Sequence, residues 1–301
     1  MLAIIVPYYK RTFFEDTLKS LAHQTDKRFK VYIGDDASPE DCSSLLEAYK
    51  GTFDFVYKRF EANIGGSSLV KQWERCISLI GDEQWIMILG DDDFIGPNLV
   101  SAFYSHFDAF NTKTSVVRFA KQLIFEKTKT VGEVQLHPVW EKASDSYYSR
   151  LTGLTTSSLS EYAFTKETYQ KHGFFDYPLA WHSDDRAWLE FSDGQPIYTI
   201  NEAIVTVRSS FINISGKSDN REQKSQVVVT FFWFLVKEKQ HLFDKKQCIR
   251  IMREYENAIR RVRAFTAKDA LRLLPFYIKN FETSTFIAFV KRSVKSIIGK
   301  P

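Results

Sequence analysis

Short apolar runs alternate with amphipathic segments through the first hundred residues, and this alternation constrains the fold more than any other feature. The apolar runs are continuous and rich in β-branched residues, which is typical of strands buried on both faces of a parallel sheet. Four such strands are predicted, at Leu2–Pro7, Lys30–Asp36, Phe53–Arg59 and Trp85–Gly90. Helices are predicted to start at Thr12-x-x-Glu15, Ser38–Pro39, Leu69 and Pro97. The sequence therefore predicts an α/β fold, with a mostly parallel central sheet flanked by helices.

The pattern loosens from about Val116 to Ser215. Short β-like runs alternate with polar loops, which predicts an α+β extension of the same sheet. These runs are Ser115–Phe119, Val131–Leu136, Ile197–Ile200 and Ala203–Val207. From about residue 222 onward the spacing of apolar residues is helical. We therefore divide the chain into residues 1–110, 111–220 and 221–301, and expect the last segment to form a separate C-terminal helical region.

The C-terminal segment is strongly basic, although the whole chain carries a formal charge of only +4. From Lys237 to Pro301 there are 16 basic and 6 acidic residues, a net charge of +10, which leaves the rest of the chain at −6. One apolar stripe is predicted at Phe286, Phe289, Val290, Val294, Ile297 and Ile298, with Lys291, Arg292 and Lys295 off it.

Two interpretations of this segment stay open. Its helices could lie on an anionic membrane surface, or they could form a bundle that packs on the rest of the chain or joins a homo-oligomer. Nucleic acid is not expected as a partner, because the chain carries no recognised binding motif.

Cysteine usage and hydropathy favour a cytoplasmic protein. Cys42, Cys76 and Cys248 are too few and too widely spaced for a disulfide framework or a cysteine-based zinc site. The longest apolar run, Val227–Val236, is half the ~20 residues that a membrane-spanning helix needs. We expect a cytoplasmic location, with peripheral attachment to the inner face of the cell membrane as the alternative.

Polar or aromatic clusters follow each of the four predicted strands directly. They are Pro7-Tyr8-Tyr9, Asp35-Asp36, Asn63-Ile64-Gly65 and Asp91-Asp92-Asp93. In open parallel sheets, ligands bind beyond the carboxyl ends of the strands. The four clusters should therefore converge on one edge of the sheet and form a site there.

The aspartate triplet is the most informative of these clusters. Three adjacent carboxylates repel one another, so folding alone does not favour them at the end of a buried strand. Mg²⁺ and Mn²⁺ prefer carboxylate and phosphate oxygens, and a metal at a strand end can neutralise a leaving diphosphate. A solvated acidic turn before the helix near Pro97 is the alternative.

Five stretches carry a family resemblance when they are taken together: IIVPYYKR, LAHQT, FKVYIGDDAS, NIGG and WIMILGDDDFIGP. As a set they resemble the nucleotide-binding half of family-2 glycosyltransferases with the GT-A fold, a Rossmann-like α/β fold. The resemblance covers residues 2–110 well and continues weakly to about residue 215. It implies a nucleotide-sugar-binding half at 1–110 and an acceptor-binding half at 111–220.

The resemblance assigns the nucleotide-binding roles residue by residue. It implies that Pro7 and Tyr9 line the base pocket, with Tyr9 stacking, and that Asp36 hydrogen-bonds the base. Asn63 and Gly65 would lie near the nucleotide. Plain turn roles remain the alternatives for Asp36 and Gly65.

In the triplet, the resemblance implies that Asp91 faces the ribose, that Asp92 ligates Mn²⁺ or Mg²⁺, and that Asp93 supports the metal site. Two departures stand out. Val70 occupies a position where the family often has arginine, so neighbouring Lys71 is the candidate phosphate contact; absence of this contact is the alternative. Gly90 occupies the position of the family's leading aspartate.

Two later segments extend the resemblance. Within AWHSDDRAWLEF (Ala180–Phe191), Asp185 matches the family's catalytic base and Asp184 its partner; capping of the helix that ends at Phe191 is the alternative role. Within VRSSFINISG (Val207–Gly216), Arg208 matches a residue of the loop over the donor diphosphate, and a plain surface loop is the alternative.

The resemblance implies an inverting glycosyltransferase that uses a nucleoside-diphosphate sugar, with uridine as the expected nucleoside, and a glycan or lipid-linked acceptor. Two alternatives stay open. One is a non-catalytic nucleotide-sugar-binding or scaffold protein. The other is a metal-dependent nucleotidyltransferase or phosphohydrolase that uses the same aspartates, although VPYYKRTFF lacks the glycine-rich loop expected of a nucleotidyltransferase.

Overall fold

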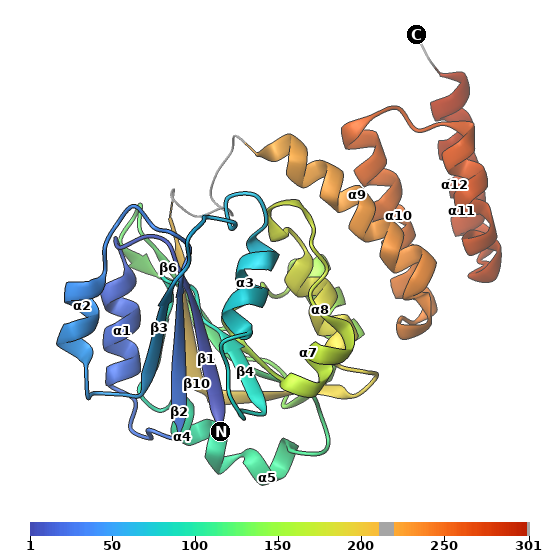
Figure 1. Ribbon diagram of the computed structural model, residues 1–301. Coiled ribbons are helices and arrows are strands. Elements are labelled where there is room, and N and C mark those ends of the chain that lie inside the picture. Colours follow the sequence, from blue (N-terminus) through green and yellow to red (C-terminus); the bar gives the residue numbers. More distant parts are fainter. Residues whose placement is uncertain (211–219, 300–301) are drawn as a thin grey trace. The chain divides into compact units, whose positions relative to one another are not determined.

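The structure, a computed structural model, describes residues 1–210 and 220–299 (Figure 1). The chain divides into two compact units, Met1–Lys217 and Ser218–Pro301. The segments predicted as two halves, 1–110 and 111–220, contribute strands to a single sheet in the first unit. The loop predicted over the diphosphate lies mostly outside the described residues, since only Val207 to Ser210 of it are described.

Within the described residues, ten strands form this sheet. They are β1 (Leu2–Tyr8), β2 (Phe29–Asp35), β3 (Phe55–Arg59), β4 (Trp85–Ile88), β5 (Phe94–Ile95), β6 (Val116–Phe125), β7 (Thr130–Val131), β8 (Trp140–Lys142), β9 (Tyr162–Thr165) and β10 (Pro196–Ser209). Their order is β3-β2-β1-β4-β9-β6-β10-β5, with β7 beside β6 and β8 beside β10. The α/β class is confirmed, and each of the four predicted strands lies within two residues of its expected bounds.

Parallel pairing is confined to two parts of the sheet. Strands β3, β2, β1 and β4 are parallel neighbours, and β6 is parallel to β10. Strand β9 lies antiparallel between β4 and β6, and the short strands β5, β7 and β8 are also antiparallel to their partners. The sheet is therefore more mixed than the sequence pattern predicted.

Helices cover both faces of the sheet (Figure 1). One core cluster joins the sheet to α1 (Phe14–Ala22), α2 (Ser43–Tyr49), α4 (Leu99–Ser105) and α5 (Phe107–Phe110). The other joins it to α3 (Leu69–Ile77), α6 (Ala143–Leu151), α7 (Lys166–His172) and α8 (Ser183–Phe191). In β1, Leu2, Ile4 and Val6 belong to the first cluster and Ala3 and Ile5 to the second. This alternation explains why the strand reads as an uninterrupted apolar run.

Two predicted helix starts are wrong, and so is the predicted separation of two β-like runs. Helix α1 has no side-chain cap, so the Thr12–Glu15 capping box does not form. Helix α2 begins at Ser43 rather than after Pro39; the Ser38 hydroxyl accepts from the Glu40 N–H (3.0 Å) and donates to the Tyr9 carbonyl (2.7 Å), but no helix follows directly. The two β-like runs at 197–200 and 203–207 form one strand, β10, whose register against β6 shifts between residues 200 and 204.

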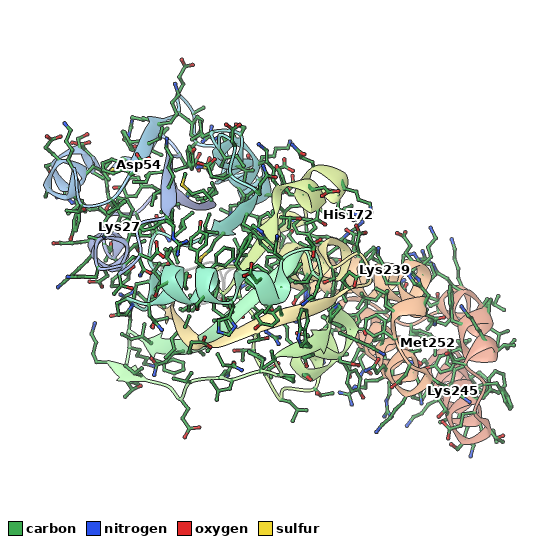
Figure 2. The ribbon with its side chains drawn as sticks, turned by 90° about the horizontal axis from the view of Figure 1, so that it is seen from below. Lys27, Asp54, His172, Lys239, Lys245 and Met252 are labelled. Atoms are coloured by element: carbon green, nitrogen blue, oxygen red, sulfur yellow. The ribbon has the colours of Figure 1, made fainter. Side chains whose placement is uncertain are left out.

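The second unit is helical, as predicted. It contains α9 (Arg221–Glu238), α10 (Lys245–Val262), α11 (Ala267–Lys279) and α12 (Thr283–Ile298). Capping boxes start α10 at Asp244 and α11 at Thr266. Lys239 and Lys245 belong to this basic unit (Figure 2). In the described part of the chain, no helix combines the length and hydropathy needed to cross a membrane.

Candidate active site

The aspartate triplet lies after β4, beside the end of β1. Asp91 Oδ2 accepts hydrogen bonds from the backbone N–H groups of Tyr9 (2.8 Å) and Lys10 (2.9 Å). These bonds form because β1 and β4 are parallel neighbours and their carboxyl ends meet at the same edge. The structure thus brings together two of the clusters that the sequence placed at this edge.

Asp93 is buried and is held from two other directions. The Ser160 hydroxyl donates to its Oδ2 (2.5 Å), and the backbone N–H of Arg208 donates to its Oδ1 (2.9 Å). The Ser160 hydroxyl also accepts from the N–H of Gly90 (3.2 Å). Both Asp93 oxygens therefore face protein donors, which suits a supporting role. Sequence reasoning missed Ser160, since no motif or spacing singles it out.

The carboxylates of the triplet oppose one another's ionisation. Burial, and then the charge of Asp92, raise the pKa of Asp91 to about 6 and that of Asp93 to about 7. A cation bound here would favour the ionised forms. At Gly90, an added Cβ would lie 3.0 Å from carboxylate oxygens of both Asp92 and Asp93, so glycine leaves these two groups room.

The triplet fits a hard divalent ion held by few protein ligands. Among residues 1–210 and 220–299, no three His, Cys, Asp or Glu side chains are grouped to enclose a metal. Mg²⁺ and Mn²⁺ sites completed by substrate phosphates need only one or two carboxylates. Asp92, which is half-buried, is the candidate for that contact.

Asp36 closes the glycine-rich turn onto the end of β2. Its carboxylate accepts from the N–H groups of Ile64 (2.8 Å) and Gly65 (2.9 Å). A Cβ at Gly65 would lie 2.4 Å from Asp36 Oδ2, so this approach requires glycine. Burial raises the pKa of Asp36 above its ordinary value.

Sequence reasoning missed Arg75 of α3. Its guanidinium pairs with Asp36 and lies over the Phe60 ring, 4.0 Å from the centroid. Val70, where arginine was expected from the family pattern, is fully buried in the core. The available signal was helical spacing, because Arg75 lies one turn after Lys71 on the same face. Lys71 itself is exposed, as is Asn63, whose side-chain oxygen accepts from the Gly66 N–H (2.7 Å).

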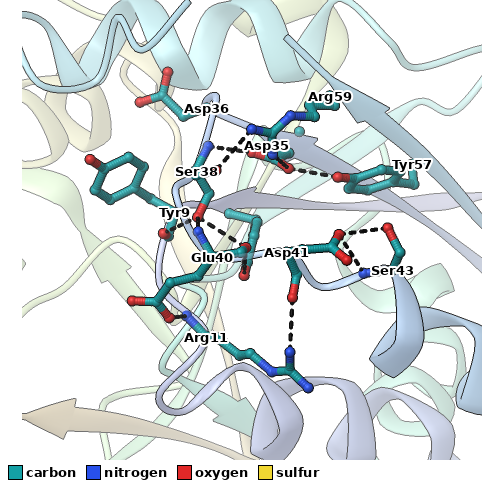
Figure 3. Close-up of polar contacts among 12 residues, drawn as sticks. Tyr9, Arg11, Asp35, Asp36, Ser38, Glu40, Asp41, Ser43, Tyr57 and Arg59 are labelled. Atoms are coloured by element: carbon teal, nitrogen blue, oxygen red, sulfur yellow. Dashed lines mark hydrogen bonds and ion pairs between the residues drawn. The ribbon is translucent and has the colours of Figure 1, made fainter.

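A polar network behind Tyr9 and Asp36 fixes their loops (Figure 3). Asp35 is fully buried and accepts from the Tyr57 hydroxyl (2.6 Å), from Arg59 (2.7 Å) and from the Ser38 N–H (2.8 Å). The Tyr9 side chain is 37% exposed, so its ring is open to a ligand. Pro7 is half-buried near the end of β1. The expected base-pocket residues therefore share one supported edge.

The Asp184–Asp185 pair begins helix α8, on the opposite face of the sheet from α1. Asp185 is buried; its Oδ1 lies 3.0 Å from Arg150 Nε of α6, and its Oδ2 accepts from His182 Nδ1 (2.6 Å). Arg150 and His182 outweigh the effect of burial and hold the pKa of Asp185 below its ordinary value. Burial and the Asp185 charge raise the pKa of the partly buried Asp184 to about 7.

The segment before the pair is conformationally strained. Leu179, Ala180 and His182 have φ angles of 62°, 52° and 67°, in the left-handed region. Each such residue costs on the order of 1 kcal/mol or more, and the fold has to hold it in place. Asp184 Oδ1 accepts the backbone N–H of Asp185 (2.9 Å) within the first turn of α8, whereas Asp185 is held by Arg150 and His182, so helix capping does not account for Asp185. Strain next to two perturbed carboxylates is typical of a functional site.

Arg208 supports the triplet from behind. It is 5% exposed, and its guanidinium donates to the Asp92 carbonyl (2.9 Å), to Asp16 (2.6 Å) and to Glu126. Its side chain thus links β10 and α1 to the aspartate turn. Glu161, next to Ser160 in the sequence, is fully buried and pairs with buried Lys121 of β6 (3.1 Å).

Comparison with known proteins identifies the family to which this site belongs. Residues 3–162, more than half of the chain, match the family described as "Glycosyl transferase family 2". The chain belongs to this family. It is therefore a glycosyltransferase, and its matched residues include the triplet, Asp36 and Ser160. No protein of curated function matches the chain.

Solved structures share the fold of this glycosyltransferase. TarS 1–349 of S. aureus in complex with UDP-GlcNAc is 16% identical over 93% of this chain and 79% of its own, with a TM-score of 0.64. The mannosyltransferase PcManGT of Pyrobaculum calidifontis in complex with GDP-Man and Mn²⁺ is 13% identical over 100% of this chain and 88% of its own, with a TM-score of 0.56. At these identities the likeness shows the fold, and the predicted GT-A architecture is confirmed.

Proposed function

We propose that this glycosyltransferase moves a sugar from a uridine-diphosphate sugar to a hydroxyl of a glycan or lipid-linked acceptor, with inversion at the anomeric carbon. The observation that carries the proposal is the presence of two carboxylate groups in the first unit, each held by its own set of hydrogen bonds. The triplet lies at the edge formed by β1 and β4, where Asp91 accepts two backbone N–H groups, and the Asp184–Asp185 pair starts α8, where Arg150 and His182 hold Asp185.

The donor lies along the first edge. Tyr9 stacks on the base, Asp36 accepts a base N–H, and Asp91 faces the ribose. Asn63, Gly65 and Lys71 border the nucleotide, and Arg208 holds the triplet in place. Asp92 is the ligand for Mn²⁺ or Mg²⁺, with Asp93 in support; the ion supplies positive charge against the leaving diphosphate. Relatives of this fold were solved with UDP-GlcNAc and with GDP-Man and Mn²⁺, which supports a nucleotide-sugar donor.

The acceptor is activated by the second group. As the acceptor oxygen forms a bond to the anomeric carbon, its proton passes to a carboxylate oxygen of Asp185. The bond from that carbon to the diphosphate breaks, and its electron pair leaves with the diphosphate. Arg150 and His182 keep Asp185 ionised and oriented, which is the state a proton acceptor requires. One base and one displacement invert the configuration.

Thermal shift and turnover together test this proposal. UDP and UDP-sugars should raise the melting temperature only with Mn²⁺ or Mg²⁺, since a ligand of the folded state stabilises it. Asp92→Ala should lose that shift, whereas Asp185→Asn should keep it and lose turnover. Product NMR reports the anomeric configuration. Nucleotide binding without sugar release in any condition would instead support a non-catalytic binding protein, and a retained configuration would contradict the single displacement.

A further inference from the structure

Helix α12 presents apolar side chains to solvent along its outer face. Ile287, Val290, Val294, Ile297 and Ile298 are between 39% and 76% exposed; we call these five residues the outer stripe. The single stripe predicted from the sequence is therefore divided. Phe289 turns inward, is 2% exposed and stacks on Tyr277, with ring centroids 4.1 Å apart. Val290 and Val294, in contrast, are 40% and 48% exposed.

Positive charge borders the outer stripe along one side. Lys291 and Lys295 are exposed, lie one helical turn apart and follow Val290 and Val294 directly in the sequence. Residues 284, 288, 291 and 295 have the spacing of one helix face, so the lysines continue the line of Ser284 and Ala288. Each lysine therefore lies about 100° around the helix axis from the valine that precedes it.

A cavity opens on the side of Ser284 and Ala288. It has a volume of about 320 Å³ and is lined by Ile249, Arg253, Tyr277, Ser284, Thr285, Ala288 and Arg292 of α10, α11 and α12. Arg292 is paired with buried Glu256 (Nη2 to Oε1 2.9 Å), so its charge is compensated within the unit. Arg253 is exposed at the rim and adds positive charge there.

We propose that the C-terminal unit docks on a membrane surface that contains anionic phospholipid. The outer stripe enters the boundary between headgroups and acyl chains, Lys291 and Lys295 contact lipid phosphates, and the cavity beside them receives one phosphate headgroup. Amphipathic helices bind anionic membranes in this way, through buried apolar area and attraction to charged headgroups.

Charge favours a lipid surface over a second copy of the chain. The segment from Lys237 onward carries a net charge of +10. Two copies that met through the outer stripe would bring the lysine rows of like charge together, whereas an anionic bilayer complements them. The remainder of the chain carries a net charge of −6, so an anionic bilayer attracts the C-terminal segment more strongly than the rest of the chain.

Vesicle sedimentation tests the proposal on the full chain. Wild type should bind phosphatidylcholine vesicles that contain phosphatidylglycerol, and should be released by high salt. Lys291→Gln with Lys295→Gln should weaken binding roughly 25-fold, because each lysine near an anionic surface contributes about fivefold. Val290→Ser with Val294→Ser should weaken it about tenfold or more at an unchanged melting temperature. Lys19→Gln with Lys113→Gln, exposed lysines of the first unit, form the matched control.

Three results would overturn the proposal. Equal binding to vesicles with and without phosphatidylglycerol would remove the role of lipid charge. Self-association in light scattering that Val290→Ser with Val294→Ser abolishes would show that a second copy covers the outer stripe. Release of wild type from vesicles by millimolar inorganic phosphate at constant ionic strength would show that the cavity binds free phosphate instead. Loss of nucleotide binding has no bearing on any of these readouts, so the two proposals fail separately.

Discussion

Replacing Arg150 by methionine should expose how the proposed base is kept ionised. Arg150 Nε lies 3.0 Å from Asp185 Oδ1, and the two side chains are 27% and 2% exposed. Removing one partner of a buried ion pair typically costs 3–5 kcal/mol, because the other charge stays buried without compensation. Arg150 is partly exposed and His182 still donates to Asp185, so we expect about 3 kcal/mol, at the low end of that range.

The same change should alter the pH dependence of turnover. The pKa of Asp185 is depressed in the folded wild type, so its carboxylate stays ionised through neutral pH, and the stability it contributes is lost only as the pH falls through that depressed value. In Arg150→Met, burial is no longer outweighed, and the pKa of Asp185 rises. The rate should then fall as the pH is lowered, in a range where the wild-type rate is constant.

The assay is kcat/KM for sugar transfer, or for donor hydrolysis, between about pH 5 and 8 at saturating Mn²⁺, with urea unfolding at neutral pH for stability. Arg186→Met is the matched control: Arg186 also lies on α8, and it pairs with Glu190 (3.0 Å). Equal pH profiles for the two variants would refute the reasoning. A wild-type rate that falls below about pH 7 while the affinity for UDP stays constant would instead make Asp184 the proton acceptor, since its pKa is about 7, whereas protonation of Asp93 would also weaken metal-dependent UDP binding.

Three further changes probe the donor edge. Ser160→Ala removes the hydroxyl that donates to Asp93 (2.5 Å) and should weaken Mn²⁺-dependent UDP binding about tenfold in calorimetry; unchanged affinity would deny the positioning role. Gly65→Ala places a Cβ 2.4 Å from Asp36 and should weaken UDP binding about tenfold. Its control is Gly81→Ala, whose Cβ meets nothing closer than 3.4 Å. Equal affinities of the two variants for UDP would show that Asp36 adapts. Arg208→Lys keeps the charge, but a lysine cannot reach Asp16, Glu126 and the Asp92 carbonyl together. The free energy of unfolding should therefore fall by roughly 3 kcal/mol. A loss below about 1 kcal/mol would show that these contacts contribute little to stability.

The sequence by itself determined the first half of the sheet and the residues at its edge. A parallel strand buried on both faces must be apolar at every position, as β1 is, and its polar followers must lie beyond its carboxyl end. That local rule places Tyr9, Asp36 and Asp91–Asp93 without knowledge of contacts between distant segments. The same rule gave no sign of β9, whose antiparallel insertion depends on a chain reversal that periodicity does not encode.

Tertiary structure decided which partners those residues have. Asp185 is kept ionised by Arg150, 35 positions away along the chain, and Arg208 reaches Asp16, 192 positions away. Ser160 and Arg75 acquire their roles only when β9 and α3 pack beside β4 and β2. On α12, spacing identified the apolar residues but did not indicate which of them pack into the unit. In the structure Phe289 is buried, whereas Val290 and Val294 are exposed to solvent. Periodicity along a chain fixes which residues share a face, whereas the neighbour that each face meets depends on how distant segments pack together.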